Sequence, residues 1–137
     1  MIQLDFRDMH LDGDRPRDAF GILLGVNATF TVLAGELQLL VEEEFPIVEL
    51  AAQLKHWVDC GGDAPFEYES LEAEDILLWF KPESAGWLIG SDWQNEPSEH
   101  LFRLDDFKSA AGSYIDRVKR QVKAELDLDV TKAFNLR

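Results

Sequence analysis

The sequence predicts an α+β fold in which an antiparallel sheet of about six strands carries a middle helix and a long C-terminal helix on one face. Short segments alternate apolar and polar residues, most connections between them have the length of hairpins, and two longer segments repeat apolar residues at helical spacing. The 137 residues are enough for one hydrophobic core, and no linker or internal repeat divides them. We therefore expect residues 1–137 to form a single domain.

The first segment predicts a half-buried strand. Ile2, Leu4 and Phe6 alternate with polar residues. Apolar residues resume on the opposite parity at Met9, which indicates a β-bulge or a strand end near Asp8.

A β-hairpin is predicted next. Residues 19–33 are apolar, and the β-branched and aromatic residues over 29–32 favour a strand. Ala34 and Gly35 are expected to form the turn, and residues 36–43 the returning strand. Three apolar residues share one face of that strand: Leu37, Leu39 and Val41.

The middle of the chain predicts an amphipathic helix over residues 46–59. Pro46 suits the first turn, where its missing amide hydrogen has little cost. Gly61 and Gly62 are expected to end the helix in a left-handed conformation. The apolar face of this helix consists of Ile47, Leu50, Ala51, Leu54 and Val58.

A second group of strands follows this helix. Phe66 and Tyr68 alternate with Glu67 and Glu69, so the aromatic rings are expected to enter the core while the carboxylates project from the other face. Three more strands are expected at residues 76–80, 87–93 and 100–104.

The last helix is predicted over residues 105–126, with Asp105 as the N-cap. Gly112 is expected to weaken this helix and to permit close packing. The tail over residues 127–137 has sparse apolar residues and is expected to fray. The apolar stripe of the helix consists of Phe107, Ala111, Tyr114, Val118, Val122 and Leu126.

The charge of the chain is strongly negative and unevenly distributed. The formal net charge is −14. Residues 41–75 contain eleven Asp and Glu against one Lys, so this quarter of the chain contributes −10. If the strand of Glu42 neighbours the strand of Glu67, these carboxylates converge on one surface. The expected partner-binding carboxylates are Glu42, Glu43, Glu44, Glu67, Glu69, Glu72, Glu74 and Asp75.

An acidic surface of this kind indicates a basic protein partner, because complementary potentials speed encounter and suppress wrong partners. The same surface also aids solubility and protects strand edges, and that interpretation stays open. Direct nucleic-acid binding is not expected, since phosphate contacts need clustered Lys and Arg. Trp93, which follows Asp92, is the expected exposed aromatic anchor.

The chain has no segment long and apolar enough for a transmembrane helix, so no membrane association is expected. No secretory-signal pattern is visible in residues 1–18, and Cys60 is the single cysteine. We therefore expect a cytoplasmic protein.

No catalytic signature stands out. None of the three histidines is expected to have a His or Cys partner at helical spacing, so no metal site and no cofactor are expected. Cys60 paired with a distant histidine is a weak nucleophile candidate without a local signature. The expectation is that the protein is not an enzyme.

The segment from Glu42 to Ala51, with acids, then Phe45-Pro46, then a helix, resembles a pattern in small bacterial proteins that continue into an aromatic-rich meander and a closing helix. In size, acidity and layout such proteins resemble the immunity proteins of polymorphic-toxin and contact-dependent inhibition systems. The resemblance implies a cytoplasmic protein that neutralises a cognate toxin by binding it. A basic toxin such as a nuclease would suit the carboxylates.

Two alternatives remain open at this point. One is a small carboxylate-based enzyme or small-molecule-binding protein, which a deep pocket with two carboxylates between sheet and helix would favour. The other is a self-associating structural subunit, which a large exposed apolar patch would favour.

Overall fold

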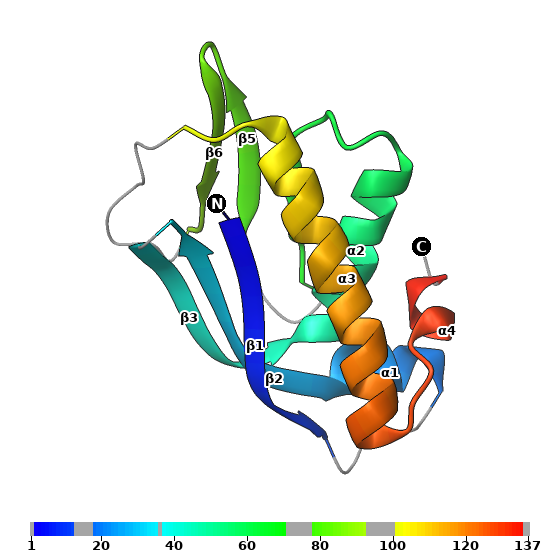
Figure 1. The fold of residues 1–137 in the computed structure, drawn as a ribbon. Coiled ribbons are helices and arrows are strands. Elements are labelled where there is room, and N and C mark those ends of the chain that lie inside the picture. Colours follow the sequence, from blue (N-terminus) through cyan, green and yellow to red (C-terminus); the bar gives the residue numbers. More distant parts are fainter. Residues whose placement is uncertain (1, 13–17, 36, 71–77, 93–100, 136–137) are drawn as a thin grey trace.

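A computed structural model describes residues 2–12, 18–35, 37–70, 78–92 and 101–135. It confirms the α+β class, with four helices and six strands in this part of the chain (Figure 1). The strands form two three-stranded antiparallel sheets where a single sheet was expected. Helix α2 separates β3 from β4 in the chain, and β4 begins a new sheet. The elements are β1 (Ile2–Leu11), α1 (Ala19–Gly25), β2 (Val26–Ala34), β3 (Leu37–Pro46), α2 (Ile47–Asp59), β4 (Phe66–Glu67), β5 (Trp79–Glu83), β6 (Gly86–Gly90), α3 (Leu104–Leu126) and α4 (Thr131–Phe134).

The first sheet has the order β1-β2-β3, and its register shifts at three points, two of which lie at the level of Ala28. The register shifts between Arg7 and His10 on β1 and again around Ala28 of β2 and its β3 partners. Asp8 and Glu44 have positive φ angles, 56° and 52°, at these shifts. The bulge expected near Asp8 is thus confirmed.

The second sheet has the order β4-β5-β6. Phe66 and Tyr68 are buried while Glu67 and Glu69 are exposed, as the alternation predicted. Of the expected last strand, Phe102 forms a single antiparallel bridge with Trp87.

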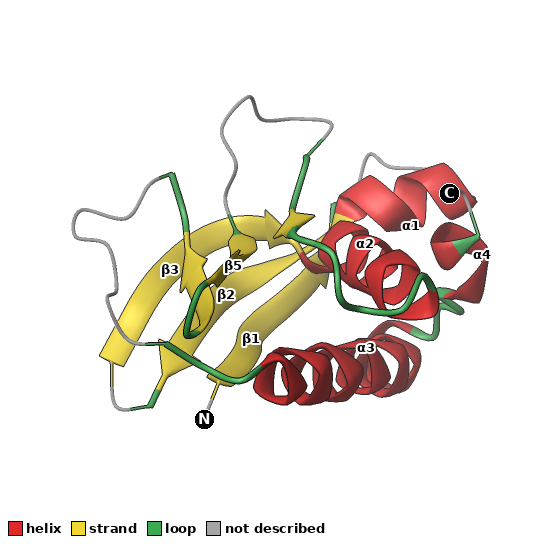
Figure 2. Cartoon of the chain, turned by 90° about the horizontal axis from the view of Figure 1, so that it is seen from above, coloured by secondary structure: helices red, strands yellow, loops and turns green. Residues whose placement is uncertain are grey.

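Helix α3 runs alongside β1, and the helices gather on one side of the strands (Figure 2). Every residue of its predicted apolar stripe is buried except Leu126, which is half-buried. The hydroxyl of Tyr114 donates to the carbonyl oxygen of Ile47 at 2.8 Å and so ties α3 to the start of α2.

Helix α2 ends at Asp59, as predicted, and begins one residue after the expected start. The Gly62 amide donates to the Trp57 carbonyl and the Gly61 amide to the Val58 carbonyl, both at 3.0 Å. Both glycines have positive φ, so the end is a Schellman motif centred on Cys60.

Several local expectations are wrong. Residues 19–25 form helix α1, because the Asp18 carboxylate caps it by accepting from the Gly21 amide at 2.7 Å. The N-cap of α3 is Arg103, whose amide donates to the Asp106 carboxylate, so Asp105 lies in the first turn.

Two apolar segments also differ from expectation. On β3, Leu40 is buried in the hydrophobic core, while Val41 of the expected apolar face is 39% exposed. The register shift between Val32 and Leu33 changes which β3 residues face inward. The tail does not fray over residues 127–135, since its apolar residues pack against α1 and α2. Those buried residues are Leu128, Val130, Ala133 and Phe134.

Candidate functional site

The structure separates the predicted acidic residues into two groups. Glu42, Glu43 and Glu44 lie on β3, at one edge of the first sheet, while Glu67 and Glu69 lie at β4 of the second. The condition that their strands be neighbours is therefore not met. The remaining predicted binding residues lie outside the described part of the chain: Glu72, Glu74, Asp75 and Trp93.

The two groups are nevertheless connected through the core. The rings of Phe45 and Tyr68 pack with centroids 5.3 Å apart. Phe45 follows Glu44 directly, and Tyr68 lies between Glu67 and Glu69.

The β3 group is crowded with like charges. Glu42 is half-buried, and burial together with the neighbouring Glu43 carboxylate raises its pKa above the ordinary value. The Glu44 carboxylate lies 2.9 Å from Nε2 of His10, which reaches it across the sheet from β1. Glu43 is exposed.

The β4 group lines a groove, which we call the α2–β4 groove. It has a volume of about 430 Å³ and lies between one face of α2 and the chain from Ala64 to Glu69. Its lining residues are Gln53, His56, Trp57, Cys60, Ala64, Pro65, Phe66, Glu67 and Glu69.

Side chains of α2 hold both ends of this groove. Gln53 pairs with the backbone of Glu69, donating to its carbonyl at 2.6 Å and accepting from its amide at 2.9 Å. The indole N–H of Trp57 donates to the Ala64 carbonyl at 2.7 Å. Sequence reasoning missed Gln53, because a buried amide on a helix gives no sign of which backbone it will meet.

The same groove contains a Cys–His contact. Sγ of Cys60 lies 3.7 Å from Nε2 of His56, one helical turn earlier. The expectation that no histidine has a helical Cys partner is therefore wrong, and the spacing of four residues in the sequence already carried the signal. Within the described residues no group of three or more His, Cys, Asp or Glu is placed to hold a metal ion.

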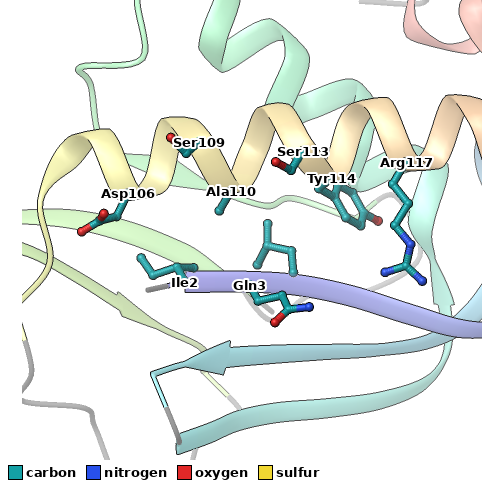
Figure 3. A pocket seen from close by; sticks show the side chains of 9 residues that line it. Ile2, Gln3, Asp106, Ser109, Ala110, Ser113, Tyr114 and Arg117 are labelled. Atoms are coloured by element: carbon teal, nitrogen blue, oxygen red, sulfur yellow. The ribbon is translucent and has the colours of Figure 1, made fainter.

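A second groove, of about 470 Å³, lies between β1 and α3 (Figure 3). Ile2, Ala110 and Tyr114 supply apolar contacts, and Arg117 lies at one end. Asp106 is the single carboxylate among its lining residues, and it accepts from a backbone amide at the start of α3. This groove therefore lacks the pair of carboxylates that would favour the enzyme alternative, whereas the lining of the α2–β4 groove includes two, Glu67 and Glu69.

Arg117 closes the edge of the first sheet beside this groove. Its guanidinium pairs with the Asp5 carboxylate and donates to the carbonyl oxygen of Phe6 at 2.9 Å. It also lies over the Phe6 ring, 4.4 Å from the centroid. No local residue pattern indicates this pairing, since 112 residues separate the two partners.

One carboxylate is buried in the core. Glu49 is 1% exposed and accepts a hydrogen bond from the Tyr68 hydroxyl at 2.5 Å. It lies in the first turn of α2, where the helix dipole favours a negative charge. This pair fixes Tyr68, and with it the backbone between Glu67 and Glu69.

The exposed large apolar residues come from four separate segments of the described chain: Phe20, Val41, Val58 and Leu101. None of the helices in the described residues is both long and apolar enough to span a membrane.

The fold and its site define a class of protein: an α+β protein with exposed carboxylates on two sheets, one group of which borders a groove. Residues 2–124, from β1 to the last turn of α3, match the family described as Domain of unknown function (DUF7878), and the chain belongs to this family. Comparisons with curated proteins and with solved structures give no match.

Proposed function

We propose that this protein is a stoichiometric binding protein that acts in the cytoplasm as an immunity protein. It neutralises a basic toxin, such as a nuclease, by covering the cationic surface with which the toxin holds its substrate. Carboxylates are the groups that compete for such a surface, because Lys and Arg bind phosphates and carboxylates alike.

This proposal rests on those exposed carboxylates of residues 41–70 that form no ion pair with another described residue. Glu43, Asp63, Glu67 and Glu69 are all exposed, and none takes part in an ion pair within the described residues. Crowding of Glu42 by Glu43 points the same way, since an approaching cation relieves repulsion between neighbouring carboxylates.

The groups at β3 and β4 give such a partner two separate points of contact on a folded surface. A partner held at two points is oriented as well as attracted. The core contact between Phe45 and Tyr68 keeps the relative position of the two groups constant.

The first step of the test is to find a gene beside this one that encodes a secreted toxin-like protein, and the second is to express that toxin. Its expression in a host cell is expected to be lethal alone and tolerated when this protein is co-expressed. With purified proteins, the association rate should fall steeply as NaCl is raised, because salt screens electrostatic steering.

A charge-matched pair of variants separates a specific surface from net charge. Glu43→Lys combined with Glu67→Lys should slow association more than Glu83→Lys combined with Glu125→Lys, although both change the net charge equally. Glu83 and Glu125 are also exposed. Equal rates for the two variants, or a rate that salt leaves unchanged, would show that the acidic surface does not bind the toxin.

A further inference from the structure

We propose that the α2–β4 groove is an arginine-binding pocket that receives one guanidinium side chain of the protein partner. This inference rests on the proposed function, and it names the chemical group that the β4 side of the surface recognises. It commits to arginine because three features of the groove match a guanidinium.

The first feature is a preformed shape. Both ends of the groove are held by hydrogen bonds, from Gln53 to the Glu69 backbone and from Trp57 to the Ala64 carbonyl. Ligand pockets are mostly formed before the ligand arrives, and their volumes start at about 300 Å³. At about 430 Å³ this groove has room for a long side chain and part of its backbone.

The second feature is an apolar floor. Trp57 is 6% exposed and Phe66 is 5% exposed, and their ring centroids are 5.9 Å apart. A guanidinium is planar, weakly hydrated and able to lie against aromatic rings, whereas the ammonium of lysine is compact and strongly hydrated. An aromatic floor therefore favours arginine.

The third feature is the pair of carboxylates. Glu67 is the last residue of β4 and Glu69 lies two residues further along the chain; both are exposed and both line the groove. Carboxylates accept the parallel N–H groups of arginine in a bidentate arrangement. The hydrogen bonds of Gln53 fix the Glu69 backbone, and this lowers the entropy cost of binding.

The chain contains its own reporter for this pocket. Cys60 is its single cysteine, is exposed, and lines the groove. The rate at which iodoacetamide alkylates the protein therefore measures access to one wall of the pocket, and mass spectrometry follows it directly.

The probe is Nα-acetyl-arginine methylamide, and the citrulline analogue is its neutral control. The arginine compound is expected to slow alkylation of Cys60 several-fold in a saturable manner, while the citrulline compound leaves the rate unchanged. The lysine compound should bind more weakly than the arginine compound. Equal protection by arginine and citrulline would overturn the proposal.

Variants test the carboxylates. Glu67→Gln with Glu69→Gln should weaken the arginine compound about tenfold, which corresponds to about 1.4 kcal/mol. Glu83→Gln with Glu125→Gln removes the same charge from two other exposed positions and should keep full protection. Protection that survives in the first variant, or disappears equally in both, would show that the groove does not recognise the guanidinium.

The complex with the toxin separates this inference from the proposed function. If the complex forms in a salt-dependent manner and shields Cys60, both stand. If it forms but Cys60 reacts at the free rate, the pocket proposal fails while the binding function remains. If no complex forms, the proposed function fails, and the arginine compound alone decides the pocket.

Discussion

Two acidic residues of the first sheet adopt a backbone conformation that residues other than glycine avoid. Asp8 and Glu44 have positive φ at the bulges of β1 and β3, where the register shifts on both sides of Ala28. Left-handed backbone costs a residue with a Cβ roughly 1–2 kcal/mol. Bulges of this kind are often found where a sheet edge presents side chains for binding.

Replacing Glu44 measures this strain. Glu44→Gly is expected to be more stable than Glu44→Ala by about 1 kcal/mol, because both lose the contact with His10 and only glycine tolerates the positive φ. Urea denaturation of the two variants gives the difference. Equal unfolding free energies would mean that the bulge relaxes at no cost.

Both tyrosines of the chain are buried, and this predicts a loss of stability in alkali. Burial, with the Glu49 carboxylate beside it, raises the pKa of Tyr68 far above 10.0, and burial raises the pKa of Tyr114 in the same direction. The folded state therefore keeps both protons at a pH where the unfolded chain releases them. Stability is fully present below the unfolded pKa and is lost as pH rises above it, by about 1.4 kcal/mol per pH unit for each tyrosine.

Tyrosinate absorbance checks this directly, since Tyr68 and Tyr114 are the only tyrosines. The absorbance should stay flat through pH 10.0, the ordinary value, and rise together with the loss of the folded circular-dichroism signal. A smooth native-state titration centred on that value would contradict the buried placement.

At the scale of elements, Gly112 lowers the stability of helix α3, and a substitution can remove this effect. Nothing lies within 4 Å of the position where a Cβ on Gly112 would stand, so the close packing expected there does not occur. Gly112→Ala should therefore stabilise the protein by about 1 kcal/mol, the difference in helix propensity. A shift in the denaturation midpoint measures it.

Gly90 of β6 is the matched contrast. A Cβ there would lie 2.2 Å from the Trp79 ring, which covers the glycine from the neighbouring strand. Gly90→Ala should therefore destabilise by about 1–3 kcal/mol. If the two alanine substitutions shifted the midpoint in the same direction, the environment assigned to one of these glycines would be wrong.

At the scale of the whole molecule, the net charge of −14 opposes compaction. Raising NaCl from low concentration to about 0.3 M shortens the screening length and should raise the melting temperature. The variant Glu43→Gln with Glu67→Gln should have a higher melting temperature at low NaCl, and added NaCl should raise it less. A melting temperature that falls with added NaCl would mean that attractive pairs outweigh repulsion.

Local periodicity was enough to locate most elements. The helix over residues 46–59, its double-glycine end and the stripe of α3 follow from side chains that repeat at helical spacing on one buried face. The alternation from Phe66 to Glu69 correctly separated buried rings from exposed carboxylates. Each of these features depends on residues only a few positions apart.

The candidate site was predictable only in part, for the same reason. The excess of carboxylates over residues 41–75 included Glu67 and Glu69, and their alternation with aromatic residues predicted that both are exposed. That they border a groove depends on Gln53 and Trp57 reaching the backbone of another segment. The residue pattern of α2 alone, or of residues 64–69 alone, does not indicate that these two segments contact each other.

The sequence by itself determined the α+β class, the negative charge and the inward face of most elements, because these follow from side-chain chemistry and spacing along the chain. The tertiary structure alone decided that the strands divide into two sheets, that the acidic residues form two groups, and that Arg117 meets Asp5 across 112 residues. Contacts between distant segments depend on how whole elements pack, and no local repeat encodes that packing.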